Sequence, residues 1–182
     1  MGNRFRMGRF SASDRRVQSI VTAALLAALA CAATMVIRVP SPTGGYLNLG
    51  DTAVLLGAFL LGPWLGALAG GVGSAMADAL SGYMVYVPAT LVIKAVMALV
   101  AGLLYRALRE KSGGMAFAAA AGELPMVAGY WLFDALLLHS FAGAAAGIPG
   151  NLVQAGFGAA ASVFLAAALR KSGYVRSRFP GL

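Results

Sequence analysis

Charged and amide side chains interrupt several long apolar stretches of this sequence. They are Asp51, Asp78, Lys94, Glu123, Asp134, Asn151 and Gln154. A charged group at the centre of a membrane costs at least ~2.5–3.5 kcal/mol on insertion scales, so each one requires a partner or a ligand. Asn151 and Gln154 are three positions apart and would share one face of a helix. An enclosed cavity with a few such groups could bind a small molecule.

Aromatic and polar residues flank these positions. Trp131, Tyr83 and Tyr86 could stack on an aromatic ring, and Asn48 could join the two amides in reading its donors and acceptors. Lys94 would suit an anionic or phenolic oxygen of the ligand. Its counter-charge in an empty site would be one of three carboxylates, Asp78, Glu123 or Asp134.

Each residue also has a purely structural interpretation. Asp51 follows a glycine and precedes an apolar run, so it could cap a helix. Lys94 could form a structural ion pair with Asp78 or Asp134, and Tyr83 and Tyr86 could belong to an interfacial aromatic belt. One cavity would account for all these residues together, whereas the structural interpretation requires a separate reason for each.

The sequence lacks the motifs of several enzyme classes. It has no Gly-rich phosphate loop with Lys and Ser or Thr, so we expect no ATP hydrolysis by this chain. One His and one Cys do not suffice for a zinc site. Nothing resembles a nucleophile with a positioned base. We therefore expect a protein that is not an enzyme and uses no metal or cofactor.

The composition is that of a membrane protein. Of 182 residues, 60% are hydrophobic and 11% are charged, against about 25% charged in a soluble domain. We predict an all-α fold, an integral membrane bundle of six transmembrane helices. The expected spans are residues 17–37, 51–61, 64–80, 87–106, 115–138 and 149–170. Gly62 and Pro63 separate the second span from the third.

The formal net charge of +8 would suggest nucleic acid in a soluble protein, but the positions of the basic residues indicate topology instead. They are Arg4, Arg6, Arg9, Arg15 and Arg16, then Arg106, Arg109 and Lys111, then Arg170, Lys171, Arg176 and Arg178, with Arg38 apart from them. Because Lys and Arg stay on the cytoplasmic side, we predict both termini to be cytoplasmic and the polar residues to face outward. The predicted organisation is a basic tail (1–16), a transmembrane binding domain (17–171) and a second basic tail (172–182), in the plasma membrane of a bacterium or archaeon.

Small residues recur at helical spacing in the first and third spans. The two rows are Gly62, Gly66, Gly70, Ser74 and Asp78, and Ala24, Ala28 and Ala32 with Ala23 and Ala27 beside them. Such rows let helix backbones approach closely inside a membrane. They could serve packing within the bundle or docking against another membrane protein.

Five segments of the chain resemble the S components of energy-coupling factor (ECF) vitamin transporters, in the branch that binds hydroxymethylpyrimidine, pyridoxine and riboflavin. They are Tyr46-Leu-Asn-Leu-Gly-Asp-Thr, Leu61-Gly-Pro-Trp-Leu-Gly, Gly73-Ser-Ala-Met-Ala-Asp-Ala-Leu-Ser-Gly-Tyr, Pro88-Ala-Thr-Leu-Val-Ile-Lys and Gly122-Glu-Leu-Pro-Met-Val-Ala-Gly-Tyr-Trp. The resemblance covers about residues 20–135. The sixth span agrees only in hydropathy, and the basic N-terminal tail lies outside the pattern.

The resemblance implies a six-helix bundle with an outer vitamin pocket that the first loop (38–48) gates. It also implies a transmembrane coupling subunit, which contacts the alanine row of the first helix, and two cytoplasmic ATPases. The row would be Ala24, Ala28 and Ala32, or Ala23 and Ala27. For the ligand we hypothesise a small, neutral pyrimidine or pyridine vitamer.

The sequence is also compatible with two other functions. In a self-sufficient secondary carrier, an intramembrane carboxylate such as Glu123 or Asp134 would couple proton movement to transport. A purely structural membrane subunit would bind no ligand.

Overall fold

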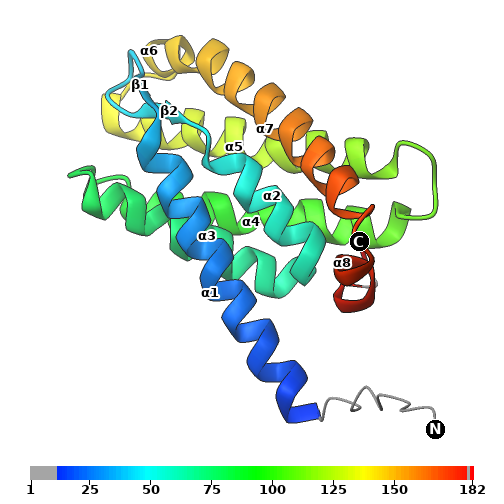
Figure 1. Ribbon diagram of the computed structural model, residues 1–182. Helices are drawn as coiled ribbons and strands as arrows, with labels where there is room; N and C mark the ends of the chain where they lie inside the picture. Colours follow the sequence, from blue (N-terminus) through cyan, green and yellow to red (C-terminus); the bar gives the residue numbers. More distant parts are fainter. Residues whose placement is uncertain (1–11, 180) are drawn as a thin grey trace, which may run out of the picture.

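The computed structural model describes residues 12–179 and 181–182, with side chains from residue 16 onward. Arg4, Arg6, Arg9 and the side chain of Arg15 therefore lie outside the described residues. The chain folds into a bundle of helices with one small hairpin (Figure 1). The first elements are α1 (Ala12–Val36), β1 (Arg38–Pro40), β2 (Tyr46–Asn48), α2 (Gly50–Leu61) and α3 (Pro63–Leu80). The remaining elements are α4 (Val87–Leu108), α5 (Gly114–Leu138), α6 (Phe141–Ala144), the 3₁₀ turn η1 (Ala145–Gly147), α7 (Ile148–Leu169) and α8 (Gly173–Arg178).

The long helices agree closely with the predicted spans. α1 begins at Ala12, however, so it includes part of the predicted N-terminal tail, and α8 lies within the predicted C-terminal tail. The all-α prediction holds for the bundle. The exception is the first connection, where β1 pairs antiparallel with β2, with Val39 opposite Leu47.

Helix length and composition separate the predicted spans into two groups. Four described segments are long and apolar enough to cross a membrane: 16–36, 87–108, 114–138 and 141–169. α2 has only 12 residues, or about 18 Å at 1.5 Å per residue, against a hydrocarbon core of about 30 Å. α3 is not among the four, since glycines and Asp78 lower its hydropathy. The count of six spans stays a prediction.

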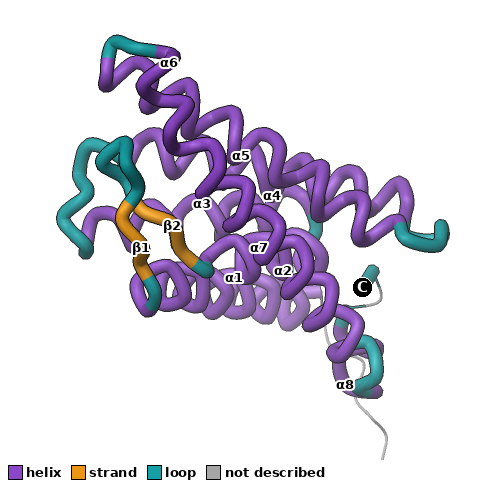
Figure 2. The backbone as a smooth tube through the Cα atoms, turned by 90° about the horizontal axis from the view of Figure 1, so that it is seen from above, coloured by secondary structure: helices purple, strands orange, loops and turns teal. Residues whose placement is uncertain are grey.

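The core of the bundle surrounds α2. Nine residues of this helix, from Gly50 to Phe59, are buried, and a helix that is apolar all round is one that neighbours cover on every side. α1, α3, α4 and α7 all contact α2. Figure 2 shows α2 among its neighbours, with α1 and α7 beside it. Large apolar side chains such as Leu25, Leu124 and Phe164 point outward instead, as expected for a surface that faces lipid.

Glycines set the closest helix contacts. A Cβ on Gly66 of α3 would lie 2.5 Å from Cα of Ala58 on α2, and one on Gly73 would lie 2.9 Å from Cα of Ala27 on α1. Real side chains are not found this close to a neighbouring backbone. The small-residue row of α3 therefore packs inside the bundle.

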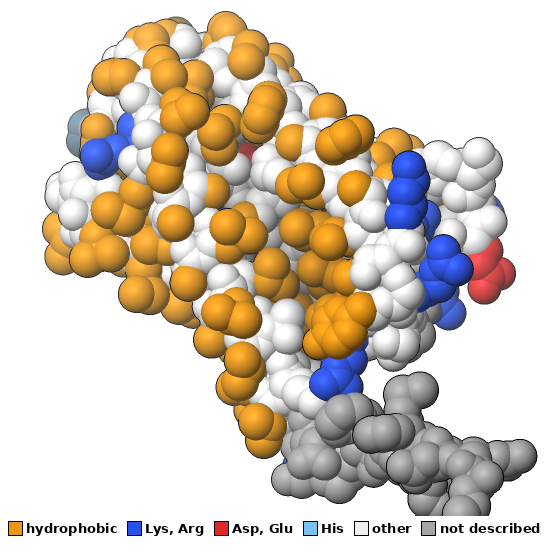
Figure 3. All heavy atoms as spheres, viewed as in Figure 1, with side chains coloured by type: hydrophobic (Ala, Val, Ile, Leu, Met, Phe, Trp, Pro, Cys, Tyr) orange, Lys and Arg blue, Asp and Glu red, His pale blue; other side chains and the backbone are white. Residues whose placement is uncertain are grey.

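The two ends of the bundle differ in charge. We call the end that carries β1, β2 and α6 the hairpin end, and the end with the C-termini of α4 and α7 and with α8 the basic end. Figure 3 shows blue Lys and Arg side chains gathered toward the basic end, with a broad orange apolar surface between the two ends. At the basic end, the Arg170 guanidinium donates to Tyr105 Oη at 2.5 Å and to the Leu182 carbonyl oxygen at 2.9 Å.

Candidate functional site

A small polar cavity lies at the hairpin end, enclosed by the hairpin and by α3, α4, α5 and α7. Its volume is about 30 Å³, which is room for roughly two water molecules. The lining residues are Ser41, Thr43, Gly45, Tyr46, Asn48, Asp78, Tyr86, Thr90, Tyr130, Asp134, Asn151 and Gln154. Segments from 41 to 154 thus converge on one cavity, which in this closed form has no room for a heterocycle.

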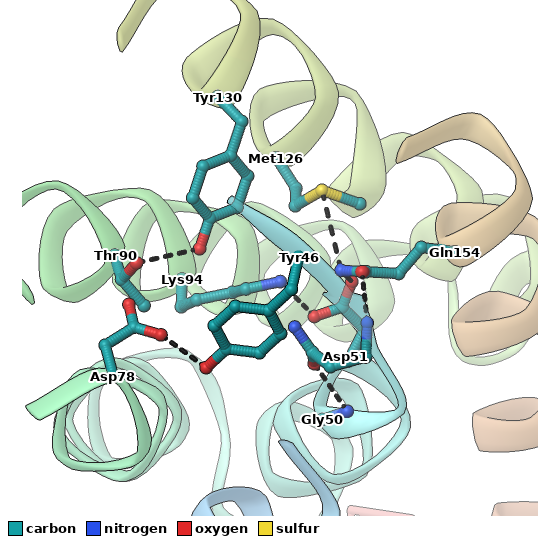
Figure 4. A network of polar contacts seen from close by, with 10 residues as sticks. Tyr46, Gly50, Asp51, Asp78, Thr90, Lys94, Met126, Tyr130 and Gln154 are labelled. Carbon is teal, nitrogen blue, oxygen red and sulfur yellow. Dashed lines mark hydrogen bonds and ion pairs between the residues drawn. The ribbon is translucent and has the colours of Figure 1, made fainter. Parts of the chain in front are cut away.

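Tyr46 of β2 closes one side of the cavity. Its hydroxyl donates to Asp78 Oδ1 on α3 at 2.5 Å (Figure 4), and its ring centroid lies 4.5 Å from that of Tyr83. Burial and the adjacent Asp78 carboxyl raise the pKa of Tyr46 above its usual range, because an ionised phenolate would be poorly solvated and repelled there. The phenol therefore stays a donor, and it holds the hairpin onto α3.

Tyr86 makes a second contact of the same kind. Its hydroxyl lies 2.9 Å from Asp134 Oδ1 on α5 and 3.4 Å from the carbonyl oxygen of Thr43. Burial and the hydrogen bond to Asp134 raise the pKa of Tyr86. The tyrosine thus links the start of α4 to α5 and to the turn of the hairpin.

Thr90 and Tyr130 complete the wall between α4 and α5. The hydroxyl oxygens of Thr90 and Tyr130 are 2.9 Å apart. The Tyr130 ring lies above Lys94, whose Nζ is 5.4 Å from the ring centroid. A cation at this distance from an aromatic face is attracted by the ring, so Tyr130 connects the cavity to the charged residues beneath it (Figure 4).

Lys94, Asp51 and Gln154 form a buried network under the cavity. Lys94 forms an ion pair with Asp51, and each side chain is 1% exposed. Gln154 Nε2 donates to Asp51 Oδ2 at 2.7 Å, while Gln154 Oε1 accepts from the backbone N–H of Asn48 at 2.7 Å. One glutamine on α7 therefore ties α2 to the last residue of the hairpin.

This network corrects two predictions. Lys94 was predicted to pair with Asp78, Asp134 or Glu123, but its ion-pair partner is Asp51. Asp51 was also considered as a helix cap, yet Leu49 is the N-cap residue of α2 and no side chain caps it. Asp51 stands in the first turn of a buried helix, where its carboxylate points toward α4 and α7.

Glu123 of α5 is buried without a hydrogen-bonding donor. It is 2% exposed, and neither of its oxygens has a hydrogen-bond partner among the described residues. Its charged neighbours are Asp51 and Lys94. A Cβ on Gly158 would lie 2.7 Å from Glu123 Oε1 and 2.8 Å from Cβ of Asp51. Gly158 therefore makes room on α7 for two carboxylates side by side.

The structure brings most of the predicted site residues together, in two layers. Asn48, Asp78, Tyr86, Asp134, Asn151 and Gln154 line the cavity. Asp51, Lys94 and Glu123 lie beneath it, and Tyr83 packs outside Tyr46. Trp131 is apart from them: it packs on Phe141 with ring centroids 5.7 Å apart, and its Nε1 donates to the Phe141 carbonyl at 3.2 Å.

Six lining residues did not figure among the predicted binding residues: Ser41, Thr43, Gly45, Tyr46, Thr90 and Tyr130. Helical spacing could have found two of them. Thr90 is four positions before Lys94, and Tyr130 is four before Asp134, so each shares a helix face with a predicted residue. Nothing in the sequence indicates that Tyr46 folds inward, because that depends on the path of the hairpin.

The alanines of α1 divide into two faces. Ala24, Ala28 and Ala32 are exposed on the outside of the bundle. Ala23 and Ala27 are half-buried, and Ala27 lies against Gly73 of α3. Of the two alternatives for the alanine row, only Ala24, Ala28 and Ala32 leave a free face for a partner.

Comparison with known proteins identifies the family. Residues 15–171 match the family described as the S component of the ECF-type riboflavin transporter. The chain belongs to this family. The match extends through α7, beyond the region in which the sequence alone resembled S components. An uncharacterised protein of the gap 3′ region of Pyrococcus woesei is 39% identical over 123 residues, which are 67% of this chain and 81% of that protein.

Family membership establishes the general role. This S component is a transport protein of the plasma membrane, it crosses the membrane more than once, and it is not an enzyme. Membership also implies a vitamin-like substrate and the other subunits of an ECF transporter as partners.

Proposed function

We propose that this S component binds a small vitamin or vitamin precursor, a pyrimidine or pyridine compound, with high affinity for an ATP-driven ECF importer. The observation that carries the proposal is the cavity at the hairpin end. Two carboxylates, three tyrosines and three amides converge there from segments that span more than a hundred residues of the chain. A cavity lined by a few converging polar groups is the usual form of a site for a small molecule.

The proposed orientation places the cavity on the outside of the cell. The basic end carries Arg106, Arg109, Arg170 and Lys171, all on the ends of long helices. Positive residues next to spans are retained in the cytoplasm. With six spans both termini are cytoplasmic, and the hairpin end faces the medium from which a vitamin is taken up.

The hairpin is proposed to gate the cavity. In the closed form Tyr46 occupies the space between Asp78 and Tyr83. A ring compound can enter only if β1, β2 and the turn between them move outward. The links that must break are few, mainly the Tyr46–Asp78 and Tyr86–Thr43 contacts and the bond from Asn48 to Gln154.

The binding experiment is a thermal-shift screen of the detergent-purified chain against vitamins and their precursors, riboflavin included. A compound at about 100 times its dissociation constant stabilises the folded state by about 2.7 kcal/mol. We expect one strong response among small pyrimidines or pyridines. If no compound in the panel raises the melting temperature, the proposal of a vitamin-binding subunit is wrong.

The coupling subunit is proposed to dock on the exposed face of Ala24, Ala28 and Ala32, and the two ATPases to bind through it. Small side chains allow a helix of another subunit to approach closely. Ala28→Trp should abolish co-purification with the coupling subunit and leave ligand affinity unchanged. Ala160→Trp is the control, since Ala160 is equally exposed but lies on α7. Survival of the complex in Ala28→Trp would rule out this face.

A reconstitution experiment separates the importer subunit from a proton-coupled carrier. The chain alone in liposomes should bind the vitamin but not accumulate it when a pH gradient is imposed. Accumulation would favour a carrier, in which Glu123, buried without a hydrogen-bonding donor, would be the first residue to replace.

A further inference from the structure

Carboxylates outnumber cations in the buried part of the bundle. Among the described residues, the buried charged side chains are Asp51, Asp78, Glu123, Asp134 and Lys94, four acids and one base. Lys94, the one base among them, forms its ion pair with Asp51 under the cavity. Arg38 of the hairpin is exposed, and its Cζ lies 6.0 Å from the centroid of the Tyr46 ring.

The cavity itself is therefore acidic. Asp78 and Asp134 both line it, and none of the other lining residues is Lys, Arg or His. A buried carboxylate without a cation is costly, and it becomes stable only when it is paired or hydrogen-bonded. The Lys94 side chain, which the sequence suggested for an anionic ligand oxygen, is not on the lining and is held by Asp51.

In this structure each of the two carboxylates accepts a hydrogen bond from a tyrosine hydroxyl. Tyr46 donates to Asp78 at 2.5 Å and Tyr86 donates to Asp134 at 2.9 Å. Both donors belong to segments that close the cavity, the hairpin and the start of α4. They are neutral donors in positions where a cationic N–H donor would add the attraction between opposite charges to the hydrogen bond.

We propose that the ligand carries a protonated amino group or ring nitrogen, which binds between Asp78 and Asp134 and takes over the hydrogen bond of Tyr46. The inference rests on the proposed function and narrows its substrate class to cationic heterocycles, in place of the neutral vitamer expected from the sequence. It also explains how the hairpin opens: a cation at Asp78 competes with the Tyr46 hydroxyl for the same oxygen. Phosphorylated and carboxylated vitamers meet two carboxylates and no lining cation, so they are excluded.

The test uses matched probes that differ in a single group. Pyridoxamine and pyridoxine differ by an aminomethyl against a hydroxymethyl group, and 4-amino-5-aminomethyl-2-methylpyrimidine differs from its hydroxymethyl analogue in the same way. Titration calorimetry of the full-length chain gives the dissociation constants. We expect the amine of the responding pair to bind at least about tenfold more tightly, equivalent to ~1.4 kcal/mol.

Variants of the two aspartates test whether they cause the tighter binding of the amine. Asp78→Asn and Asp134→Asn keep the size of the side chain and remove its charge, so each should reduce the preference for the amine to about threefold or less. Tyr46→Phe should do the opposite and raise amine affinity, since the competing hydroxyl is gone. Glu110→Gln, at an exposed position of the basic end, should leave both constants unchanged.

The outcomes separate this inference from the function on which it rests. Tighter binding of riboflavin or a hydroxymethyl compound than of either amine overturns the cationic ligand and leaves the binding subunit in place. Absence of binding by every probe contradicts the binding subunit and the inference with it. If Asp78→Asn fails to fold, Tyr46→Phe still decides, because unchanged or weaker amine affinity in that variant overturns the competition.

Discussion

The hairpin end and the basic end of this bundle belong to the same helices but differ in where their charged side chains lie. At the hairpin end, charged and hydroxyl side chains are buried in contact with one another, as in the network of Lys94, Asp51 and Gln154. At the basic end, charged side chains such as Arg106 and Arg109 are exposed, and the closest helix contacts are made by glycines and alanines. Within the described residues, charged side chains are therefore buried only where a ligand is proposed to bind.

The difference also concerns what holds the helices together. Toward the basic end, backbones approach until no side chain fits between them, as Gly66 and Ala58 show. Close packing of this kind drives helix association in lipid. At the hairpin end, hydrogen bonds between side chains also join the elements, and a cavity remains between them.

We expect the largest effect on stability from a variant that breaks the buried ion pair of Lys94 and Asp51. Lys94→Met leaves the Asp51 carboxylate buried and unpaired, so the free energy of unfolding should fall by about 3–5 kcal/mol. The double variant Asp51→Asn with Lys94→Met should recover most of the loss, because no charge is left alone. Thermal unfolding in detergent measures both, and a double variant no more stable than the single one would contradict the pairing.

Replacement of Glu123 tests the buried carboxyl group that lies beside Asp51. Glu123→Met removes a buried carboxyl group whose oxygens have no hydrogen-bond partner among the described residues, so the free energy of unfolding should rise by about 1–3 kcal/mol. Glu110→Gln at the exposed basic end is the matched control and should change it by less than about 0.5 kcal/mol. A loss of stability in Glu123→Met would mean that the carboxylate is satisfied in the membrane.

Close packing toward the basic end is tested at Gly66. Gly66→Val places side-chain atoms where the Ala58 backbone lies, so α2 and α3 must separate at a cost of about 1–3 kcal/mol. Gly156→Ala is the control, because nothing lies within 4 Å of a Cβ there. Ligand affinity should stay within about threefold of the wild type in both variants, since the cavity is at the other end; a large loss in Gly66→Val would show that the two ends are coupled.

The smallest effect compares two neighbours at the hairpin end. Tyr130 lines the cavity, whereas Trp131 packs on Phe141. Tyr130→Ala should weaken ligand binding about tenfold through the loss of a ring contact, and Trp131→Ala should change it by less than about threefold. Equal losses in calorimetric titrations of the two variants would mean that the open cavity extends to Trp131.

The helices were largely predictable, because each rests on local information. Pro63 and Gly62 mark the break between α2 and α3, and apolar runs of helical length mark α1, α4, α5 and α7. The polar residues at membrane depth were predictable too, because their cost makes them conspicuous in an apolar sequence. Helical spacing also placed Asn151 and Gln154 on one face, and both side chains do line the cavity.

The partners of those residues were not predictable. The sequence offers several carboxylates as partners for Lys94. Its partner is Asp51 because α2 packs against α4. Tyr46 enters the cavity because the first connection forms a hairpin that turns back over α3, and Trp131 leaves it because α5 rotates that position toward α6. The sequence by itself determined which groups are buried and at which end, since hydropathy and spacing act locally. Only the tertiary structure decided which groups meet, because contacts between distant segments depend on how whole helices pack.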